Sequence, residues 1–180
     1  MILLMVQTGL ISAKRVGWHR KLGMAGFVLA IAMVVLVVLT AAGLAVRVKG
    51  APAMELVLGL LSVTFTDAFD FAVLAGFAYA LRRDAAAHKR LIIIATVCLT
   101  RAAFFRWHVP ILFRQVYPAY AATYVLLLLL AGYDLWSTSR IHRATMWGSL
   151  FLIVMGQLTR LIGPSAPWHA FAHWVQRWGI

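Results

Sequence analysis

The sequence predicts an all-α protein, a five-helix transmembrane bundle with a C-terminal amphipathic helix at the membrane interface. Of its 180 residues, 63% are hydrophobic and 12% are charged, and the mean hydropathy is +0.88. Soluble domains carry roughly twice that charged fraction. The apolar residues fall in long blocks, each close to the ~20 residues needed to cross a bilayer. Basic residues gather in the short segments between the blocks, as the positive-inside rule expects.

The apolar blocks define the elements in order. Residues 1–13 are apolar but too short to cross, so we expect them to lie at the interface. The expected spans, within a single integral membrane domain 1–180, cover residues 22–46, 54–81, 89–109, 118–136 and 144–162. Pro52, Pro110 and Pro164 follow three of these blocks, and proline interrupts the helical hydrogen-bond ladder.

Residues 166–178 have a different pattern. The apolar side chains share one helical face and the polar ones the other: Phe171, Trp174, Val175 and Trp178 against His169, His173 and Gln176. A short, Trp-rich helix of this kind lies flat in the headgroup region. Two roles follow, a simple membrane anchor or a lid over the mouth of the bundle with the histidines as its inner lining.

The basic residues predict the orientation. Ten lie on the side of the N-terminus and the second and fourth connections: Lys14, Arg15, Arg20, Lys21, Arg82, Arg83, Lys89, Arg90, Arg140 and Arg143. The opposite loops and tail hold Arg47, Lys49, Arg114 and Arg177. The N-terminus is therefore predicted to be cytoplasmic and the C-terminus to lie outside. Asp134, near the inner end of its span, is expected to neutralise Arg140 or Arg143.

Ionisable residues inside the spans are the candidate functional groups. Asp67 and Asp70 share a helical face in the middle of one span, and Arg101 lies at similar depth in the next. Gln157 and Arg160 on the last span can join them in one polar cluster. Charges in hydrocarbon face the bundle interior and pair. The cluster is either a path for a proton, ion or ligand, or an ion-pair network that fixes helix register.

The histidines offer a second candidate site. They divide between the two predicted surfaces, with His19, His88 and His142 inside and His108, His169 and His173 outside. The spacing of the last two would let both bind one metal. Imidazole suits zinc, copper and haem iron, so haem b or a divalent metal is an alternative cofactor. It is not favoured, because flanking Arg and Lys repel a cation.

Composition also excludes several classes. A net charge of +12 would suggest nucleic acid in a soluble chain, but here the basic residues belong to loops beside the bilayer. Cys98 is the single cysteine, which excludes a disulfide framework. Hydrolytic catalysis has little support, because no nucleophile–base spacing is visible. Tyr120 and Tyr124 are interpreted as part of an interfacial aromatic belt.

Two helix openings carry a family resemblance. The run Trp18-His19-Arg20-Lys21-Leu22-Gly23 and the run Ala87-His88-Lys89-Arg90-Leu91 resemble an uncharacterised family of small bacterial multi-pass membrane proteins. The stretches Tyr133-Asp134-Leu135-Trp136, Arg140-Ile141-His142 and Thr145-Met146-Trp147-Gly148 extend the likeness over most of the chain. The resemblance implies the bacterial inner membrane, with a periplasmic C-terminus, and no settled activity. The first run is also similar to the start of spans in transmembrane b-type cytochromes.

Three functional classes follow. The leading one is a membrane protein that binds or moves a small ligand or a proton at the Asp–Arg cluster. The first alternative is a non-catalytic accessory subunit of a membrane complex, and the second is a haem- or metal-binding redox protein. The expected partners are the lipid bilayer and a membrane protein or second copy of the chain, with no nucleic acid.

Overall fold

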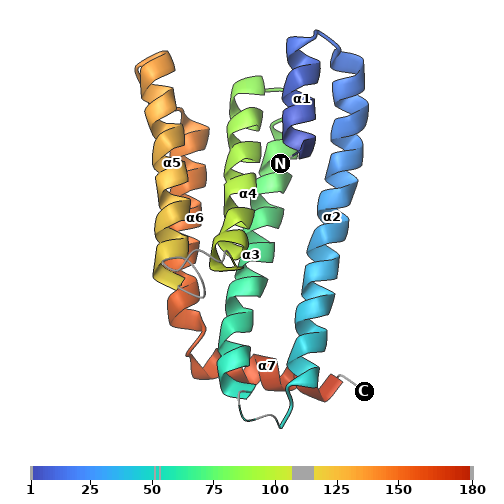
Figure 1. Ribbon diagram of the computed structural model, residues 1–180, viewed down its shortest axis with the longest axis vertical. Helices are drawn as coiled ribbons and strands as arrows, with labels where there is room; N and C mark the ends of the chain where they lie inside the picture. The colour runs from blue at the N-terminus through green and yellow to red at the C-terminus, as the bar shows by residue number, and fades with distance from the viewer. Residues whose placement is uncertain (1, 51, 53, 107–115, 179–180) are drawn as a thin grey trace.

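The computed structural model describes residues 2–50, 52, 54–106 and 116–178, and the regular structure in these ranges is helical throughout (Figure 1). The helices are α1 (Ile2–Ser12), α2 (Val16–Arg47), α3 (Met54–Ala80), α4 (Ala85–Arg106), α5 (Val116–Thr138), α6 (Arg143–Ile162) and α7 (Ala166–Trp178). Four segments are long and apolar enough to cross a membrane: Val16–Arg47, Met54–Ala80, Pro118–Thr138 and Arg143–Ile162. The prediction of an all-α membrane protein is confirmed at this level.

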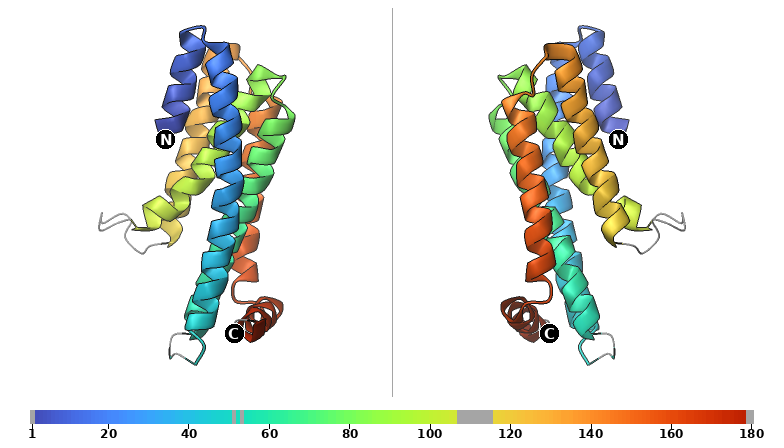
Figure 2. Two further views of the ribbon diagram at one scale, coloured as in Figure 1. Left: turned by 90° about the vertical axis from the view of Figure 1, so that its right-hand side faces the viewer. Right: turned by 90° about the vertical axis from the view of Figure 1, so that its left-hand side faces the viewer.

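The long helices run along the molecule, and α7 crosses one end (Figures 1 and 2). The connections α1–α2, α3–α4 and α5–α6 all lie at the opposite end, which we call the basic end because Lys14, Arg83 and Arg140 lie in or beside them. At the other end, which we call the α7 end, α7 packs against α2 and α3. The lower ends of α4 and α5 diverge from α3 and α6 in Figure 2.

The N-terminal segment, predicted to be too short to cross a bilayer, forms α1, which folds back beside α2 (Figure 1). Gly26 permits this approach, because a Cβ at this position would lie 2.9 Å from Cδ2 of Leu3. Since α1 runs along α2, it occupies the same layer as the first long helix.

Two apolar clusters hold the helices together. The larger joins α3, α4, α5 and α6 and consists of Leu74, Ala78, Leu91, Ile94, Ala95, Val97, Cys98, Leu127, Leu130 and Leu152. The smaller joins α2, α3 and α7 at the α7 end and consists of Ala41, Ala45, Leu58, Leu61 and Ala172. The most apolar stretch of α2 buries none of its residues inside the molecule, so its side chains face outward. In lipid such a face is solvated by acyl chains, and helix association rests on packing.

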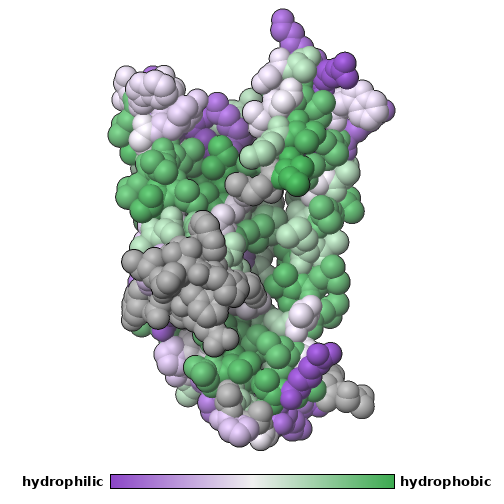
Figure 3. Space-filling model, viewed as in Figure 1, coloured by the Kyte–Doolittle hydropathy of each residue, from purple (hydrophilic) through white to green (hydrophobic). Residues whose placement is uncertain are grey.

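The surface has the banding of a protein that crosses a bilayer. Figure 3 shows hydrophobic residues over the middle of one face, with hydrophilic residues gathered at the upper end and along the lower edge. Large exposed apolar side chains such as Leu36, Leu39, Leu128 and Leu161 lie on this outer surface. An apolar area of this extent on a folded chain is the expected property of a lipid-facing surface.

α4 lies between α3 and the α5–α6 pair, at the position of the predicted third span (Figure 1). It is less apolar than the other long helices, because it contains Lys89, Arg90, Arg101 and Arg106. Arg90 and Arg101 are 5% and 4% exposed, and both are paired with carboxylates. α4 thus supplies the cation of both buried ion-pair groups described below.

Candidate functional site: the buried aspartate–arginine cluster

Three charged side chains meet inside the bundle. Asp67 and Asp70 lie three residues apart on α3, so both point toward α4. Nη2 of Arg101 on α4 donates to Oδ1 of Asp67 and to Oδ2 of Asp70, the latter at 3.1 Å. Asp70 is fully buried, and Asp67 retains 15% side-chain exposure. The expected pairing of these residues is observed, and it joins α3 to α4.

Charge and hydrogen bonding are both incomplete in this cluster. Two carboxylates face one guanidinium, so full ionisation would leave one negative charge without a partner. Oδ1 of Asp70, Nε and Nη1 of Arg101 and the hydroxyl of Tyr120 are buried and have no hydrogen-bond partner among the described residues. An unsatisfied buried donor or acceptor costs about 1–3 kcal/mol. The cluster therefore has unused capacity for a water molecule, a proton or a small polar ligand.

An aromatic wall from α5 closes one side of the cluster. The guanidinium of Arg101 lies 5.1 Å from the ring centroid of Tyr120, within the range of a cation–π contact. Gly156 on α6 makes room for both groups. A Cβ at this position would lie 2.9 Å from Cε1 of Tyr120 and 3.2 Å from Nη1 of Arg101. The site thus lies where α3, α4, α5 and α6 meet.

Gln157 and Arg160 form a separate polar group beside this wall. Nη1 of Arg160 donates to Oε1 of Gln157 at 3.2 Å, and Nε2 of Gln157 donates to the hydroxyl of Tyr124 at 2.9 Å. Both side chains are exposed. The rings of Tyr124 and Tyr120 are 6.1 Å apart, so the connection to the buried cluster runs through these two tyrosines. Sequence reasoning assigned the tyrosines to an interfacial belt, because spacing alone does not show that their helix faces Arg101.

Cys98 also belongs to the cluster. Its thiol lies 3.7 Å from the backbone oxygen of Asp67, and Nη2 of Arg101 lies 3.7 Å from its sulfur. Asp67, Asp70 and Cys98 bring three metal-type ligand atoms within 4.8 Å of one another. The Arg101 guanidinium already contacts all three residues, and its positive charge opposes a second cation there.

A second buried ion pair differs from the first in being fully satisfied. Arg90 on α4 donates to Asp134 on α5 through Nε at 3.0 Å and Nη2 at 2.6 Å, and its Nη1 donates to the Ala86 carbonyl at 2.9 Å. Oδ2 of Asp134 also accepts from the backbone N–H of His142 at 3.1 Å and from the hydroxyl of Thr145 at 2.5 Å. The prediction that Asp134 neutralises Arg140 or Arg143 is therefore wrong. The sequence placed Arg90 at the membrane surface, whereas α4 turns it toward α5.

The three histidines of the basic end have separate local roles. His88 contacts the Ala78 carbonyl through Nδ1 at 2.7 Å, and His142 caps α6 by accepting from the N–H of Ala144. The ring of His19 lies beside Gln7 of α1. Among the described residues, no group of three close metal-type ligands includes any of these histidines.

Asp84 begins α4 beside the basic end. Its Oδ1 accepts from the backbone N–H groups of Ala87 and Ala86, both at 3.0 Å, and these bonds hold the pKa of Asp84 below its ordinary value. An ionised carboxylate at this position satisfies two N–H groups that lack a partner within the helix. Asp84 therefore has a structural role as a helix cap.

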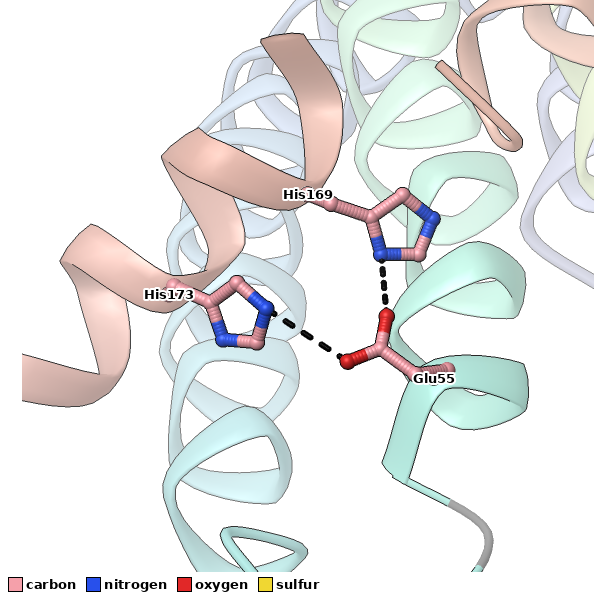
Figure 4. A group of neighbouring side chains, drawn as sticks. All are labelled: Glu55, His169 and His173. Carbon is pink, nitrogen blue, oxygen red and sulfur yellow. Dashed lines mark ion pairs between the residues drawn. The ribbon is translucent and has the colours of Figure 1, made fainter. Parts of the chain in front are cut away.

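The other histidines meet an acidic residue that sequence reasoning missed. His169 and His173 of α7 both face Glu55, in the first turn of α3 (Figure 4). Nδ1 of His169 lies 2.7 Å from Oε2 of Glu55, and Nε2 of His173 lies 3.5 Å from Oε1. His108, the expected third histidine on this side, lies outside the described residues. No local pattern could have joined Glu55 to a tail more than a hundred residues later in the chain.

Comparisons of the chain with protein-family models, with curated proteins and with solved structures found no match. The fold and the site therefore define the class of protein. It is an all-helical chain with four helices that can cross a membrane and buried Asp–Arg ion pairs between its helices. Anything narrower must come from the chemistry of the clusters themselves.

Proposed function

We propose that the chain forms a five-span bundle in which α4 is the additional span. α4 packs between α3 and the α5–α6 pair and lies alongside them, antiparallel to α3 and α5, in Figure 1. Two of the basic residues that lower its apolar character are paired inside the bundle, Arg90 with Asp134 and Arg101 with Asp67 and Asp70. A charge paired in the interior is compatible with a membrane span.

α7 is then an amphipathic interfacial helix. It crosses the ends of α2 and α3, with Ala172 and Gln176 buried against them and Phe171 and Trp174 exposed. The two exposed rings stack with centroids 6.0 Å apart, and rings of this kind favour the headgroup boundary. The basic end, with the α1–α2 connection, faces the cytoplasm and the α7 end faces outward, as the positive-inside rule requires. The resemblance to small bacterial multi-pass proteins supports the bacterial inner membrane.

The protein binds or moves a proton or a small polar ligand at the Asp67–Asp70–Arg101 cluster. The observation that carries this proposal is a group of four buried polar atoms, from Asp70, Arg101 and Tyr120, that have no hydrogen-bond partner among the described residues. They lie at a site where two carboxylates share one described guanidinium. A single proton on one carboxylate would balance the charge. The unused donors of Arg101 and the free oxygen of Asp70 can hold a ligand that both accepts and donates hydrogen bonds.

The Arg90–Asp134 pair differs from the Asp67–Asp70–Arg101 cluster in that its charges and hydrogen bonds are balanced. Asp134 and Arg90 balance one to one, and all three guanidinium nitrogens of Arg90 donate. That arrangement needs nothing further and serves register and packing alone. A chain that satisfies one buried pair completely shows that complete pairing is attainable in this fold. The incomplete pairing of Asp70 and Arg101 therefore favours a functional role over a purely structural one.

Infrared spectroscopy of the protein reconstituted in lipid tests the proposal. The chain has only five acidic residues, so the C=O stretching band of protonated carboxyl groups can be assigned by substitution. We expect a band that grows as the pH falls and that is smaller in the Asp67→Asn/Asp70→Asn variant, by a component that survives in Asp84→Asn. In D2O this component should shift as the carboxyl proton exchanges with solvent. A titrating band of the same size in the wild type and the double variant, or no titrating band in the wild type, would contradict the proposal.

The accessory-subunit function is the second candidate. It is favoured by the Arg90–Asp134 pair, which shows that this bundle uses buried ions to fix helix register. Here the lipid-facing surface, including the outward face of α2, would receive a membrane-protein partner or a second copy of the chain. The same infrared measurement separates the two functions. A cluster whose carboxyl groups never exchange with D2O is dry and structural.

A further inference from the structure

Glu55, His169 and His173 form the one cluster of metal-type side chains in the described part of the chain that contains no competing cation. The two imidazoles project from successive turns of α7 toward the carboxylate of Glu55 (Figure 4). One ligand atom from each residue can be chosen so that all three atoms lie within 4.8 Å of one another. We propose that these three residues bind a single divalent zinc ion at the α7 end.

Hydrogen bonds around His173 orient its ring. Nε2 of Gln176 donates to the backbone oxygen of Ala45 at 2.8 Å, so Oε1 of Gln176 is left as an acceptor. This oxygen lies 3.0 Å from Nδ1 of His173, which donates to it. Nε2 of His173 is thereby turned toward the Glu55 carboxylate, 3.5 Å away. The ring thus presents to the carboxylate the nitrogen that a metal ion would use.

His169 gives a second, independent indication. Its Nδ1 is buried and makes no hydrogen bond of acceptable geometry among the described residues, although Oε2 of Glu55 lies only 2.7 Å away. This nitrogen therefore lies beside the carboxylate with its hydrogen-bonding capacity unused among the described residues. The orienting contact from Gln176 to His173 is the outer partner that ligating histidines normally have.

The chemistry of the donor set selects the metal. Two imidazole nitrogens and one carboxylate oxygen match the three-ligand sites of zinc, in which water fills the fourth position. With metal–ligand bonds of about 2.0–2.2 Å, tetrahedral ligands are separated by roughly 3.3–3.5 Å. The 3.5 Å separation between His173 and Glu55 matches that range, whereas the 2.7 Å separation between His169 and Glu55 must lengthen by about 0.6–0.8 Å to admit the ion. Glu55 is 60% exposed, so its side chain can adjust and water can reach the site.

The backbone that carries the ligands is fixed by other contacts. Nε1 of Trp168 donates to the backbone oxygen of Leu58 at 2.8 Å, and Ala172 is buried against α2 and α3. Gln176 anchors the end of α7 to α2. α7 is thus docked without the metal, and zinc would add a link between α7 and α3. Replacing Glu55 should remove the metal without detaching the helix.

Cobalt and zinc titrations of the chelator-treated, tag-free protein in detergent test the site. We expect one Co²⁺ per chain, with the visible absorption bands of a four- or five-coordinate ion, and displacement by one Zn²⁺. Glu55→Gln and His173→Ala should each weaken binding at least tenfold. The matched control, His19→Ala at the basic end, should bind as the wild type does. Circular dichroism and the metal-free unfolding midpoint show whether each variant is folded.

Three results would overturn the proposal. These are the absence of a saturating one-to-one band, wild-type affinity in a folded Glu55→Gln variant, or loss of the band in His19→Ala. If Glu55→Gln itself unfolds, His173→Ala decides the question alone. Because the test uses none of the residues of the Asp67–Arg101 cluster, it can fail or succeed independently of the proposed function.

Discussion

Replacing Arg101 with methionine tests the energetics of the buried cluster. The change keeps most of the side-chain volume and removes the cation that contacts Asp67 and Asp70. Asp70 is fully buried, and its side chain pairs with Arg101 among the described residues. Breaking a buried pair by removing one partner costs about 3–5 kcal/mol, because the other charge stays buried. We expect the upper part of this range, since two carboxylates lose their partner at once.

Removing one of the two carboxylates should destabilise the protein far less than removing Arg101. Asp70→Asn removes the surplus negative charge, keeps an oxygen that can accept from Arg101, and leaves a one-to-one pair with Asp67. We expect a change in unfolding free energy of less than about 1 kcal/mol. The triple variant Asp67→Asn/Asp70→Asn/Arg101→Met should recover part of the loss seen in Arg101→Met. Arg101→Met should cost more than Asp70→Asn because the cluster contains two carboxylates and one guanidinium. An ion pair with one charge of each sign would not predict this difference.

Unfolding in mixed micelles by titration with sodium dodecyl sulfate, followed by tryptophan fluorescence, measures these differences. Arg90→Met is the control for loss of a buried arginine. It should cost less than Arg101→Met, because Asp134 keeps donors from His142 and Thr145. The reasoning is refuted if Arg101→Met changes the unfolding free energy by no more than about 0.5 kcal/mol, the range of ordinary surface substitutions. It is also refuted if Asp70→Asn costs as much as Arg101→Met.

Three further predictions follow from other parts of the structure. Gly156→Ala should destabilise the protein by about 1–3 kcal/mol, because the added Cβ would lie 2.9 Å from a tyrosine ring carbon. Gly132→Ala should not destabilise it, because nothing lies within 4 Å of that Cβ. The same micelle titration compares the two variants. Asp84→Ala should lower the thermal midpoint at neutral pH. Since the pKa of Asp84 is held low, its ionised cap stabilises fully above the ordinary aspartate pKa of about 3.9, and the difference from wild type should shrink as the pH falls below that. Cysteines placed at Lys49 and Ser139 in whole cells should react with an impermeant thiol reagent only at Lys49, and the opposite pattern would reverse the proposed orientation.

The sequence predicted the buried cluster because the energetics of charge in hydrocarbon leave few choices. Asp67, Asp70 and Arg101 lie in the middle of apolar blocks, so they had to face inward and pair. The all-helical class followed in the same way from block length and composition. These inferences need only distance along the chain and the cost of an unpaired charge. They do not require knowing which helices are neighbours.

What the sequence could not predict depends on neighbours. Tyr120 matches an interfacial residue as well as a cluster residue, and only the approach of α5 to α4 decides between them. Asp134 was assigned partners nearby in sequence, whereas its partner Arg90 comes from a different helix. Glu55 lies at the start of a predicted span, and its sequence neighbours do not indicate a partner. Its contacts come from α7, which crosses that end of the bundle. Each error concerns a residue whose role is set by a contact between helices distant in sequence.

The two ion-pair groups connect α4 to different helices. Arg101 ties it to α3, and Arg90 ties it to α5 and, through Asp134, to the start of α6. The two arginines are separated by about 16 Å along the helix axis. A helix with both charges unpaired would be costly in lipid, by at least a few kcal/mol for each charge. The stability of α4 in the proposed five-span bundle therefore comes from its neighbours. The satisfied pair links three helices, while the cluster around Arg101 keeps the unused polar atoms that the proposed binding function needs.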